Sequence, residues 1–393
     1  MIPEFYVKSF IYNILRCNIN LVFARTLTLV RVDLQDRITR VEPLVIRITR
    51  LTARRRQMET DDWGESKNLR LTNGVLTFLT CVLFLSSVRV GNCQEKEKPL
   101  AQKSEKQSKK RKSPDKGPFV LVGAGDIASC ADLSGAEATA KLIEKIPGEV
   151  FAAGDLAYEK GTAQEFANCY DKTWGRFKNR THPAPGNHEY ASKNGSPYFD
   201  YWGKQAGPPE KGYYSFDLGV WHVVALNTNC DAPGLGGCGP GSPEDLWLQK
   251  DLADHSKSCI VAFGHHALYS SGIFKKHAIH PELRQFWRDL YKAHADLVLN
   301  GHEHSYERFA PQDPDGNLDP KNGIREIVAG TGGRSNDLLG FAIPNSEVRN
   351  ATSFGVLKLT LWPGKYTWEF VPVDADGLHD SGSGTCHNVM PTN

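Results

Sequence analysis

The chain has 393 residues, 40% of them hydrophobic, which is enough for one large domain or two with their own cores. Its formal net charge of +2 is a cancellation. Residues 1–57 hold ten arginines and one lysine against four acids, whereas residues 118–393 hold 24 basic residues, 33 acidic residues and all thirteen histidines. The basic excess lies outside the part predicted to fold, so the charge gives no argument for nucleic-acid binding, and no nucleic-acid partner is expected.

Residues 58–94 are predicted to be a signal peptide or a membrane anchor. They contain the uncharged run LTNGVLTFLTCVLFLSSV, whose apolar centre, 75–85, has the length of a secretory signal rather than of a spanning helix. Met58 lies a suitable distance upstream, so residues 1–57 are interpreted as a doubtful or disordered basic leader. No small-x-small cleavage site follows the run, which leaves an uncleaved anchor, or lipidation at Cys93, as alternatives.

Residues 95–117 are predicted to be a disordered, lysine-rich linker. Between 95 and 116 there are nine basic residues, four acids, one leucine and no aromatic side chain. Such a segment buries too little apolar surface to offset the entropy lost on ordering. We interpret it as a solvated tether.

Residues 118–393 are predicted to form an α/β domain. Strands are expected at 118–126, 148–155, 259–264 and 295–301, helices at 134–146, 242–255 and 281–294, and hairpins at 212–228 and 354–373. Ser134 and Glu137 have the spacing of a capping box at the start of the first helix. This order of elements indicates two stacked mixed β-sheets with helices outside.

Six cysteines fall in the predicted domain: Cys130, Cys169, Cys230, Cys238, Cys259 and Cys386. An even number of cysteines behind a predicted signal peptide favours disulfide bonds in an oxidising compartment. Cys230 and Cys238 are the predicted pair, and no C-x-x-C motif supports zinc binding instead. The chain is therefore expected to be exported, as a periplasmic, extracellular or surface-anchored protein.

Five apolar runs end in a glycine that is followed by, or lies close to, side chains able to bind metals. These positions are Gly125-Asp126, Gly154-Asp155 with Tyr158, Gly186-Asn187-His188, Gly264-His265-His266, and Gly301-His302 with His304. Ligands of open α/β sheets bind beyond the carboxyl ends of the strands, so these loops can converge on one place. Carboxylate, amide, imidazole and phenol groups without a thiolate suit iron, zinc or manganese, and seven protein ligands fit two metals better than one.

The blocks GDIAS, GDLAY, GNHE, GHHALYSS and GHEHSYER, in this order, resemble the signature of the calcineurin-like metallophosphoesterases. Tyr158 in GDLAY and the final HSYER make the sequence similar to purple acid phosphatases, in particular compact secreted bacterial ones. The resemblance covers roughly residues 117–387 and implies the metallo-dependent phosphatase fold, a four-layer α/β/β/α sandwich.

Position by position, the resemblance implies a first metal bound by Asp126, Tyr158 and His304, a second bound by Asn187, His265 and His302, and Asp155 as the bridge between them. The first is a ferric ion in purple phosphatases, and the second is Fe(II), Zn(II) or Mn(II). His188 is expected to face the substrate and to act on a phosphate oxygen or the leaving alkoxide. The nucleophile is expected to be a metal-bound hydroxide that attacks phosphorus in line.

Some positions stay open. His266 is an alternative to His265 as a ligand, and Ala267 stands where the family usually has proline. His277 is the nearest match to a second substrate-binding histidine, with a plain surface residue as the alternative. Arg334 in AGTGGR either approaches phosphate or belongs to a glycine-rich turn. The other histidines are interpreted as structural.

The predicted function is a metal-dependent phosphoesterase, most directly a phosphomonoesterase similar to acid phosphatases, acting on a phosphorylated small molecule. A phosphodiesterase with the same metal centre is the alternative reaction. A metal-binding surface protein without catalysis is the alternative of another class, and the non-ligating His188 argues against it. The N-terminal segment would provide any attachment to a membrane or cell surface.

Overall fold

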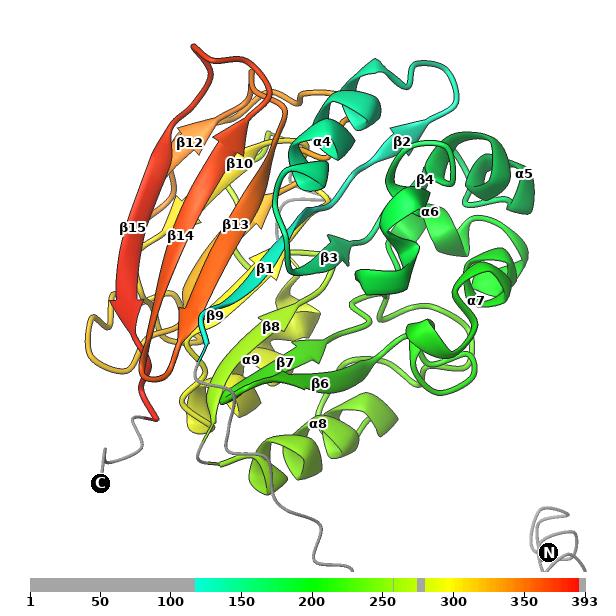
Figure 1. Cartoon of the computed structure of the whole chain (residues 1–393). Coiled ribbons are helices and arrows are strands. Elements are labelled where there is room, and N and C mark those ends of the chain that lie inside the picture. Colours follow the sequence, from blue (N-terminus) through cyan, green and yellow to red (C-terminus); the bar gives the residue numbers. More distant parts are fainter. Residues whose placement is uncertain (1–116, 257, 274–279, 389–393) are drawn as a thin grey trace, which may run out of the picture. The chain divides into compact units, whose positions relative to one another are not determined.

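A computed structural model describes residues 117–256, 258–273 and 280–388 (Figure 1). These residues form two stacked β-sheets with helices against their outer faces. The predicted leader, the signal peptide or anchor, and nearly all of the linker lie outside the described residues and stay predictions.

The first sheet has six strands in the order β15-β14-β13-β1-β3-β5. Their bounds are β1 Phe119–Ala124, β3 Glu149–Ala153, β5 Thr181–Ala184, β13 Gly355–Trp362, β14 Lys365–Pro372 and β15 Asp380–Thr385. β1, β3 and β5 are parallel, and β13 pairs with β1 antiparallel. Because side chains alternate along a strand, Leu121 and Phe151 pack in the core between the sheets, and Val122 and Val150 pack in the core on the other face.

The second sheet has seven strands in the order β12-β10-β11-β9-β8-β7-β6. Their bounds are β6 Tyr214–Leu218, β7 Trp221–Ala225, β8 Cys259–Phe263, β9 Leu297–Asn300, β10 Tyr306–Phe309, β11 Arg325–Ala329 and β12 Ser346–Asn350. β7, β8, β9 and β11 are parallel to one another. Val223 and Val261 join the core between the sheets, whereas Val224 and Ile260 pack in the outer core with the helices.

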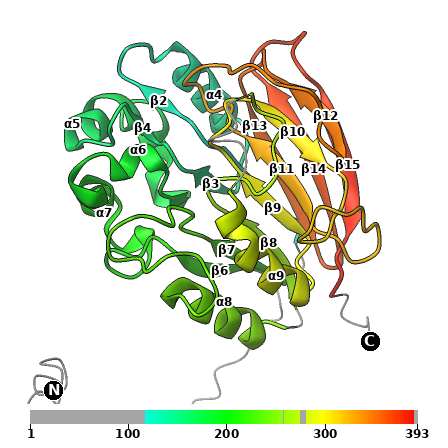
Figure 2. The ribbon, with the colours of Figure 1, turned by 180° about the vertical axis from the view of Figure 1, so that it is seen from behind.

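Three longer helices cover these outer faces: α4 Ser134–Glu144, α8 Pro243–Asp254 and α9 Arg284–Lys292. Figure 2 shows α8 and α9 in front of the second sheet, where Leu248 and Phe286 are buried. Further elements are β2 Ala128–Ser129, β4 Ala157–Tyr158, α5 Ala163–Glu165, α6 Asn187–Tyr190 and α7 Ser196–Trp202, with a π-helical turn Phe166–Tyr170 and 3₁₀ turns Trp174–Arg180, Lys193–Gly195, Gly203–Ala206 and Pro281–Leu283. Layer by layer this is the predicted four-layer sandwich.

The start of α4 differs from the prediction. Ser134 is the first helical residue rather than the N-cap, which is Leu133 without a side-chain hydrogen bond. The side chain of Asp132 accepts a hydrogen bond from the Ser134 backbone N–H at 2.8 Å. An aspartate two residues earlier therefore satisfies the helix terminus, and the predicted capping box is wrong.

Three disulfide bonds join the six cysteines of the domain: Cys130–Cys169, Cys230–Cys238 and Cys259–Cys386. The pairing predicted for Cys230 and Cys238 is confirmed. Among the described residues, no helix combines the length and the apolar character needed to cross a bilayer.

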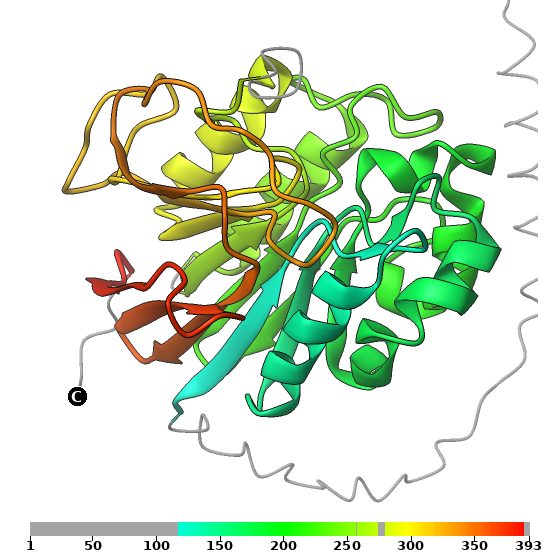
Figure 3. The same ribbon diagram turned by 90° about the horizontal axis from the view of Figure 1, so that it is seen from above.

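The parallel strands bring the loops that carry the predicted metal ligands to one end of the two sheets. The segments after β1, β3 and β5 come from the first sheet, and those after β8 and β9 come from the second. Figure 3 looks onto this end of the domain. The crevice beyond the strands, where α/β sheets bind their ligands, is therefore lined from both sheets.

Candidate metal centre

The backbone turns sharply at three of the predicted ligands. Asp126, Asp155 and His302 have φ values of 61°, 52° and 71°, in the left-handed region that side chains other than glycine adopt rarely. The glycines nearby provide space: a Cβ at Gly186 would lie 2.1 Å from Asp155 Oδ1, and one at Gly301 would lie 2.6 Å from Asp126 Oδ2. Glycine is required at these two positions because the carboxylates press against the backbone.

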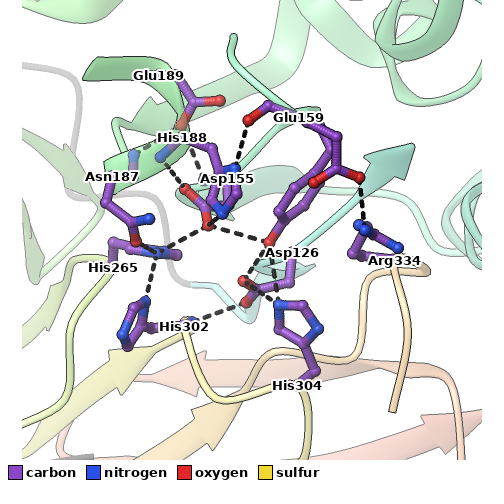
Figure 4. Close-up of polar contacts among 12 residues, drawn as sticks. Asp126, Asp155, Glu159, Asn187, His188, Glu189, His265, His302, His304 and Arg334 are labelled. Carbon is purple, nitrogen blue, oxygen red and sulfur yellow. Dashed lines mark hydrogen bonds and ion pairs between the residues drawn. The ribbon is translucent and has the colours of Figure 1, made fainter. Parts of the chain in front are cut away.

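The first half-site gathers around the hydroxyl group of Tyr158 (Figure 4). This oxygen lies 2.8 Å from Asp126 Oδ1, 3.0 Å from Asp155 Oδ2 and 3.1 Å from His304 Nε2. His304 Nε2 is also 3.3 Å from Asp126 Oδ1. We call Asp126, Tyr158 and His304, together with Asp155, the first half-site.

The second half-site gathers around Nε2 of His265. This nitrogen lies 3.0 Å from Asn187 Oδ1, 3.1 Å from His302 Nδ1 and 3.3 Å from Asp155 Oδ2. Asn187, His265 and His302, together with Asp155, form the second half-site. The same oxygen of Asp155 thus contacts both half-sites.

The protons of these side chains are too few for the contacts they make. The Tyr158 hydroxyl has one proton, yet two carboxylate oxygens and a histidine nitrogen surround it. His265 Nδ1 contacts the Ala153 carbonyl oxygen at 2.9 Å and donates its proton there, so Nε2 carries at most one proton for the three ligand atoms of Asn187, His302 and Asp155 that surround it. Converging oxygen and nitrogen lone pairs in a buried site fit a cation at each half-site.

The charges of the site also favour a bound cation. Burial lowers the pKa of His265, but the negative charges of Asp155 and Asp126 outweigh it and raise that pKa to about 9. Burial raises the pKa of Asp155, but the neighbouring His265 and His188 lower it to about 2. The side chains of Asp126 and Asp155 are buried together, and their negative charge favours a cation between them.

Residues 120–306 match the family model of the calcineurin-like phosphoesterases, and this stretch contains both half-sites. This part of the chain is therefore similar to the calcineurin-like phosphoesterases. The similarity predicted from the five sequence blocks is thereby confirmed, and the family implies a two-metal centre.

The relatives and solved structures similar to the chain include purple acid phosphatases. Probable purple acid phosphatase 20 of Arabidopsis thaliana is 27% identical over 226 residues, which are 51% of this chain and 48% of that protein. Purple acid phosphatase 15 of the same plant is 28% identical over 232 residues, 50% of this chain and 42% of that protein. The chain thus spans about half the length of these curated relatives.

The purple acid phosphatase PPD1 from yellow lupin (Lupinus luteus) seeds has a similar solved structure. It superposes with a TM-score of 0.55 at 21% identity, covering 71% of this chain and 57% of that chain. At this identity the likeness shows the fold, and it confirms the predicted phosphatase sandwich.

Glu189 holds the loop that carries the shared aspartate. Its buried carboxylate accepts backbone hydrogen bonds from Asp155 at 2.9 Å, Leu156 at 2.8 Å, Ala157 at 3.3 Å and Gly186 at 2.7 Å. Burial and the nearby charge of Asp155 raise the pKa of Glu189 to about 7. Glu189 therefore positions the backbone of the loop that carries Asp155.

His188 lies beside the half-sites and outside both ligand groups. Its backbone N–H donates to Asp155 Oδ1 at 2.9 Å, and its Nδ1 lies 2.6 Å from the Glu159 carbonyl oxygen. Its Nε2 is 3.7 Å from Asp155 Oδ2, and 30% of its side chain is exposed. The ring is therefore fixed through Nδ1, and its exposed part remains accessible to a substrate.

The structure places the remaining candidate histidines differently from one another. His266 Nδ1 lies 3.0 Å from the Thr228 hydroxyl, and ligand atoms of His265, His266 and His302 lie within 4.8 Å of one another. His265 Nε2 contacts Asn187 at 3.0 Å, which favours His265 as the ligand, and His266 lies beside it. His277 lies outside the described residues, and its predicted role stays a prediction. His280, interpreted from sequence as structural, has its ring 4.3 Å from that of His266 and 5.4 Å from that of His302.

A cavity of about 380 Å³ lies beside the second half-site, and Asn187, His266 and His280 line it. The signal for His280 in the sequence is its position in KKHAIH, shortly after the fourth block.

The glycine-rich segment at 329–334 packs against the first aspartate loop. Gly332 N–H donates to Gly125 O at 2.9 Å, and Arg334 N–H donates to Asp126 O at 3.0 Å. The Arg334 guanidinium pairs with Glu159 at 2.5 Å and lies 5.1 Å from the centre of the Tyr158 ring. The segment is thus a turn, and it also brings a cation to the edge of the first half-site.

Proposed function

We propose that this chain hydrolyses phosphoric esters, most directly phosphomonoesters, with metal ions at both half-sites. The observation that carries the proposal is the position of Asp155 Oδ2, which contacts Tyr158 in one half-site and His265 in the other. One carboxylate oxygen between two groups of lone pairs is the arrangement that a two-metal hydrolase needs. The family of the domain supports the same reaction class.

The ligand atoms favour different metals at the two half-sites. The phenol of Tyr158 with two carboxylates and an imidazole suits Fe(III), and the amide and imidazoles of the second half-site suit Fe(II), Zn(II) or Mn(II). The chemistry that such a pair supplies is a water of lowered pKa and stabilisation of negative charge on the phosphoryl oxygens.

The chain's own residues would then orient the ester and move the proton. Because the Glu159 carbonyl oxygen accepts the Nδ1 proton of His188, Nε2 faces the half-sites and can hold the proton that a leaving alkoxide takes. Imidazoles of His266 and His280 line the adjoining cavity, where they would contact phosphate oxygens or the leaving group. Glu189 would keep Asp155 in place between the cations.

The proposal includes the compartment of the protein, its substrate and its attachment. Three disulfide bonds favour export to an oxidising compartment. The substrate would be a phosphorylated small molecule, and the predicted segment at 58–94 would provide any attachment to a membrane or surface.

The test combines metal analysis with two model esters. The chain, produced in an oxidising compartment, is analysed for metals by plasma mass spectrometry, its visible spectrum is recorded, and its rates on p-nitrophenyl phosphate and bis(p-nitrophenyl) phosphate are compared. We expect two metals per chain, iron among them with a broad tyrosinate band, and a clear preference for the monoester.

Other outcomes separate the alternatives. Two metals with a preference for the diester would replace the phosphomonoesterase by a phosphodiesterase. Two metals without the band would remove Tyr158 from the ligands of a ferric ion. A chain with two metals and no turnover of either ester would favour the non-catalytic metal-binding protein.

A further inference from the structure

The loop between β11 and β12 exposes an apolar tip beside the metal centre. Phe341 is 99% exposed, Leu338 is 72% exposed, and Ile273 from a neighbouring loop is 41% exposed. We call these three side chains the rim patch. Residues 338–344 read LLGFAIP, seven uncharged residues in a row. Exposed apolar runs of this kind destabilise a soluble surface unless a partner covers them, so they mark interaction sites.

The rim patch is held in a defined position by backbone contacts. Gly340 N–H donates to the Ser271 carbonyl oxygen at 2.7 Å, and Gly272 pairs with Leu339 in an antiparallel bridge. Ile343 N–H donates to the Ser271 hydroxyl at 3.1 Å. The two loops are therefore joined, and their apolar side chains project from a fixed base rather than from a loose end.

The same loop contacts a residue of the first half-site. The Ser335 hydroxyl lies 2.6 Å from His304 Nδ1, and Asp337 N–H donates to the His304 carbonyl oxygen at 2.9 Å. Leu338 follows directly in the chain. Whatever covers the rim patch therefore lies next to the metal centre, at the end of the domain seen in Figure 3.

The size of the patch favours a lipid surface over a protein partner. A stable protein interface buries about 800 Å² on each side with roughly 20 residues, far more than three side chains supply. A bilayer needs only a few apolar side chains at a projecting tip, with polar groups left at the headgroups. Arg349, which is exposed, donates to the Gly340 carbonyl oxygen at 2.8 Å and places a guanidinium beside the tip.

The charge of the domain selects the kind of bilayer. Residues 118–393 have nine more acidic than basic residues, so an anionic membrane would repel them. We propose that the rim patch inserts into a zwitterionic lipid bilayer and holds the metal centre at the membrane surface. The predicted anchor at 58–94 would bring the domain to such a surface. The proposal does not require the phosphoesterase reaction.

The test follows hydrogen exchange in the loop, because the apolar segment at 75–85 could itself bind lipid and dominate a simple binding assay. The full chain is compared with and without phosphatidylcholine vesicles. We expect exchange of peptides covering 335–345 to slow several-fold with vesicles. The double variant Leu338→Ser/Phe341→Ser should lose this protection. The control Leu246→Ser/Leu318→Ser, at two leucines each 58% exposed and outside the patch, should keep it.

Two results would overturn the proposal. Unchanged exchange at 335–345, whether or not the chain sediments with vesicles, would mean that the rim patch does not enter the bilayer. Protection that appears without vesicles and rises with protein concentration would mean that a second copy of the chain covers the patch. Each result is read from the loop itself and is independent of catalytic activity.

Discussion

Two groups of histidine and aspartate side chains lie in this domain, and they differ in how their protons are placed. The first group, at the candidate metal centre, consists of Asp126, Asp155 and His265, and the second consists of Asp217, His222 and His255. In each group the possible ligand atoms lie within 4.8 Å of one another. Residue type and distance therefore do not distinguish them.

The second group is closed by its own hydrogen bonds. We call it the His222 cluster: Asp217, His222, Asp251 and His255. His222 Nδ1 lies 2.9 Å from Asp217 Oδ1, and its Nε2 lies 2.8 Å from Asp251 Oδ2, so each ring nitrogen meets a carboxylate. The His255 ring stacks on His222 at 3.7 Å and 12°, an orientation in which the nitrogen lone pairs of the two rings do not converge.

The comparison teaches that a metal centre needs lone pairs aimed at a common point and a shortage of protons. At the half-sites, the Tyr158 hydroxyl and His265 Nε2 each have three ligand atoms around them and at most one proton. In the His222 cluster each ring nitrogen of His222 faces one carboxylate. We accordingly expect substitutions in the first group to change metal binding and catalysis, and substitutions in the second to change stability alone.

The largest effect is expected from Asp155→Asn. The amide removes the negative charge that both half-sites share, so the content of both metals should fall and the hydrolysis rate should drop about 10³-fold or more, since a metal supplies several kcal/mol to the transition state. Plasma mass spectrometry and initial rates measure both. Asp217→Asn in the His222 cluster is the control and should keep both metals. Loss of one metal alone from Asp155→Asn would contradict the shared position.

The next effect is expected from His188→Ala. Its Nε2 lies near Asp155 but outside the ligand groups, so both metals should stay while the turnover number falls by roughly 10² to 10⁴, as is typical of acid–base groups. His255→Ala is a matched control, because its side chain is also 30% exposed. Unchanged turnover in His188→Ala would remove it from the reaction.

A smaller effect is expected from Glu189→Gln. The carboxylate accepts hydrogen bonds from the backbone N–H groups of residues 155–157 and of Gly186, and an amide replaces one acceptor oxygen by a donor. Metal affinity should weaken by about ten- to a hundredfold, the range for residues that orient ligands. Competition with a chelator measures it. Glu244→Gln, a buried glutamate that accepts one backbone hydrogen bond from Asn227, should leave metal affinity unchanged.

The smallest effect is expected from His222→Asn, which should lower the free energy of unfolding. Burial lowers the pKa of His222, but hydrogen bonds to Asp251 and Asp217 outweigh it and raise the pKa, so this contribution is full below the unfolded value of about 6.5 and is lost as pH rises through the folded value. The pKa of Asp251 is lowered by His222 despite burial, so its contribution is lost as pH falls through its folded value.

The pH dependences of the His222 and Asp251 contributions determine the pH values at which unfolding should be measured. Wild type should exceed His222→Asn in free energy of unfolding by about 2 kcal/mol between pH 5 and 6, and by less at pH 9. Urea denaturation at the two pH values checks this, and metal content serves as the control. An equal difference at both pH values would mean that His222 acts by packing rather than by charge.

Much of the fold could be predicted because its signals are local. The apolar runs of β1 and β3, the helical spacing of α8 and the hairpin that turns at Pro363-Gly364 each depend on a few neighbouring residues. The predicted N-cap of α4 was wrong because Asp132, not Ser134, accepts a hydrogen bond from the backbone at this helix terminus. Sequence spacing alone does not rank such competitors.

The sequence by itself determined which side chains would stand at the ends of the strands, because each block couples a strand, a glycine and a ligand within a few residues. Only the tertiary structure decided that His280 lines the cavity and that each ring nitrogen of His222 faces a carboxylate. The physical reason is that direction and proton count depend on partners far apart in the chain. Asn187 and His265 meet across 78 residues, and His222 and Asp251 across 29.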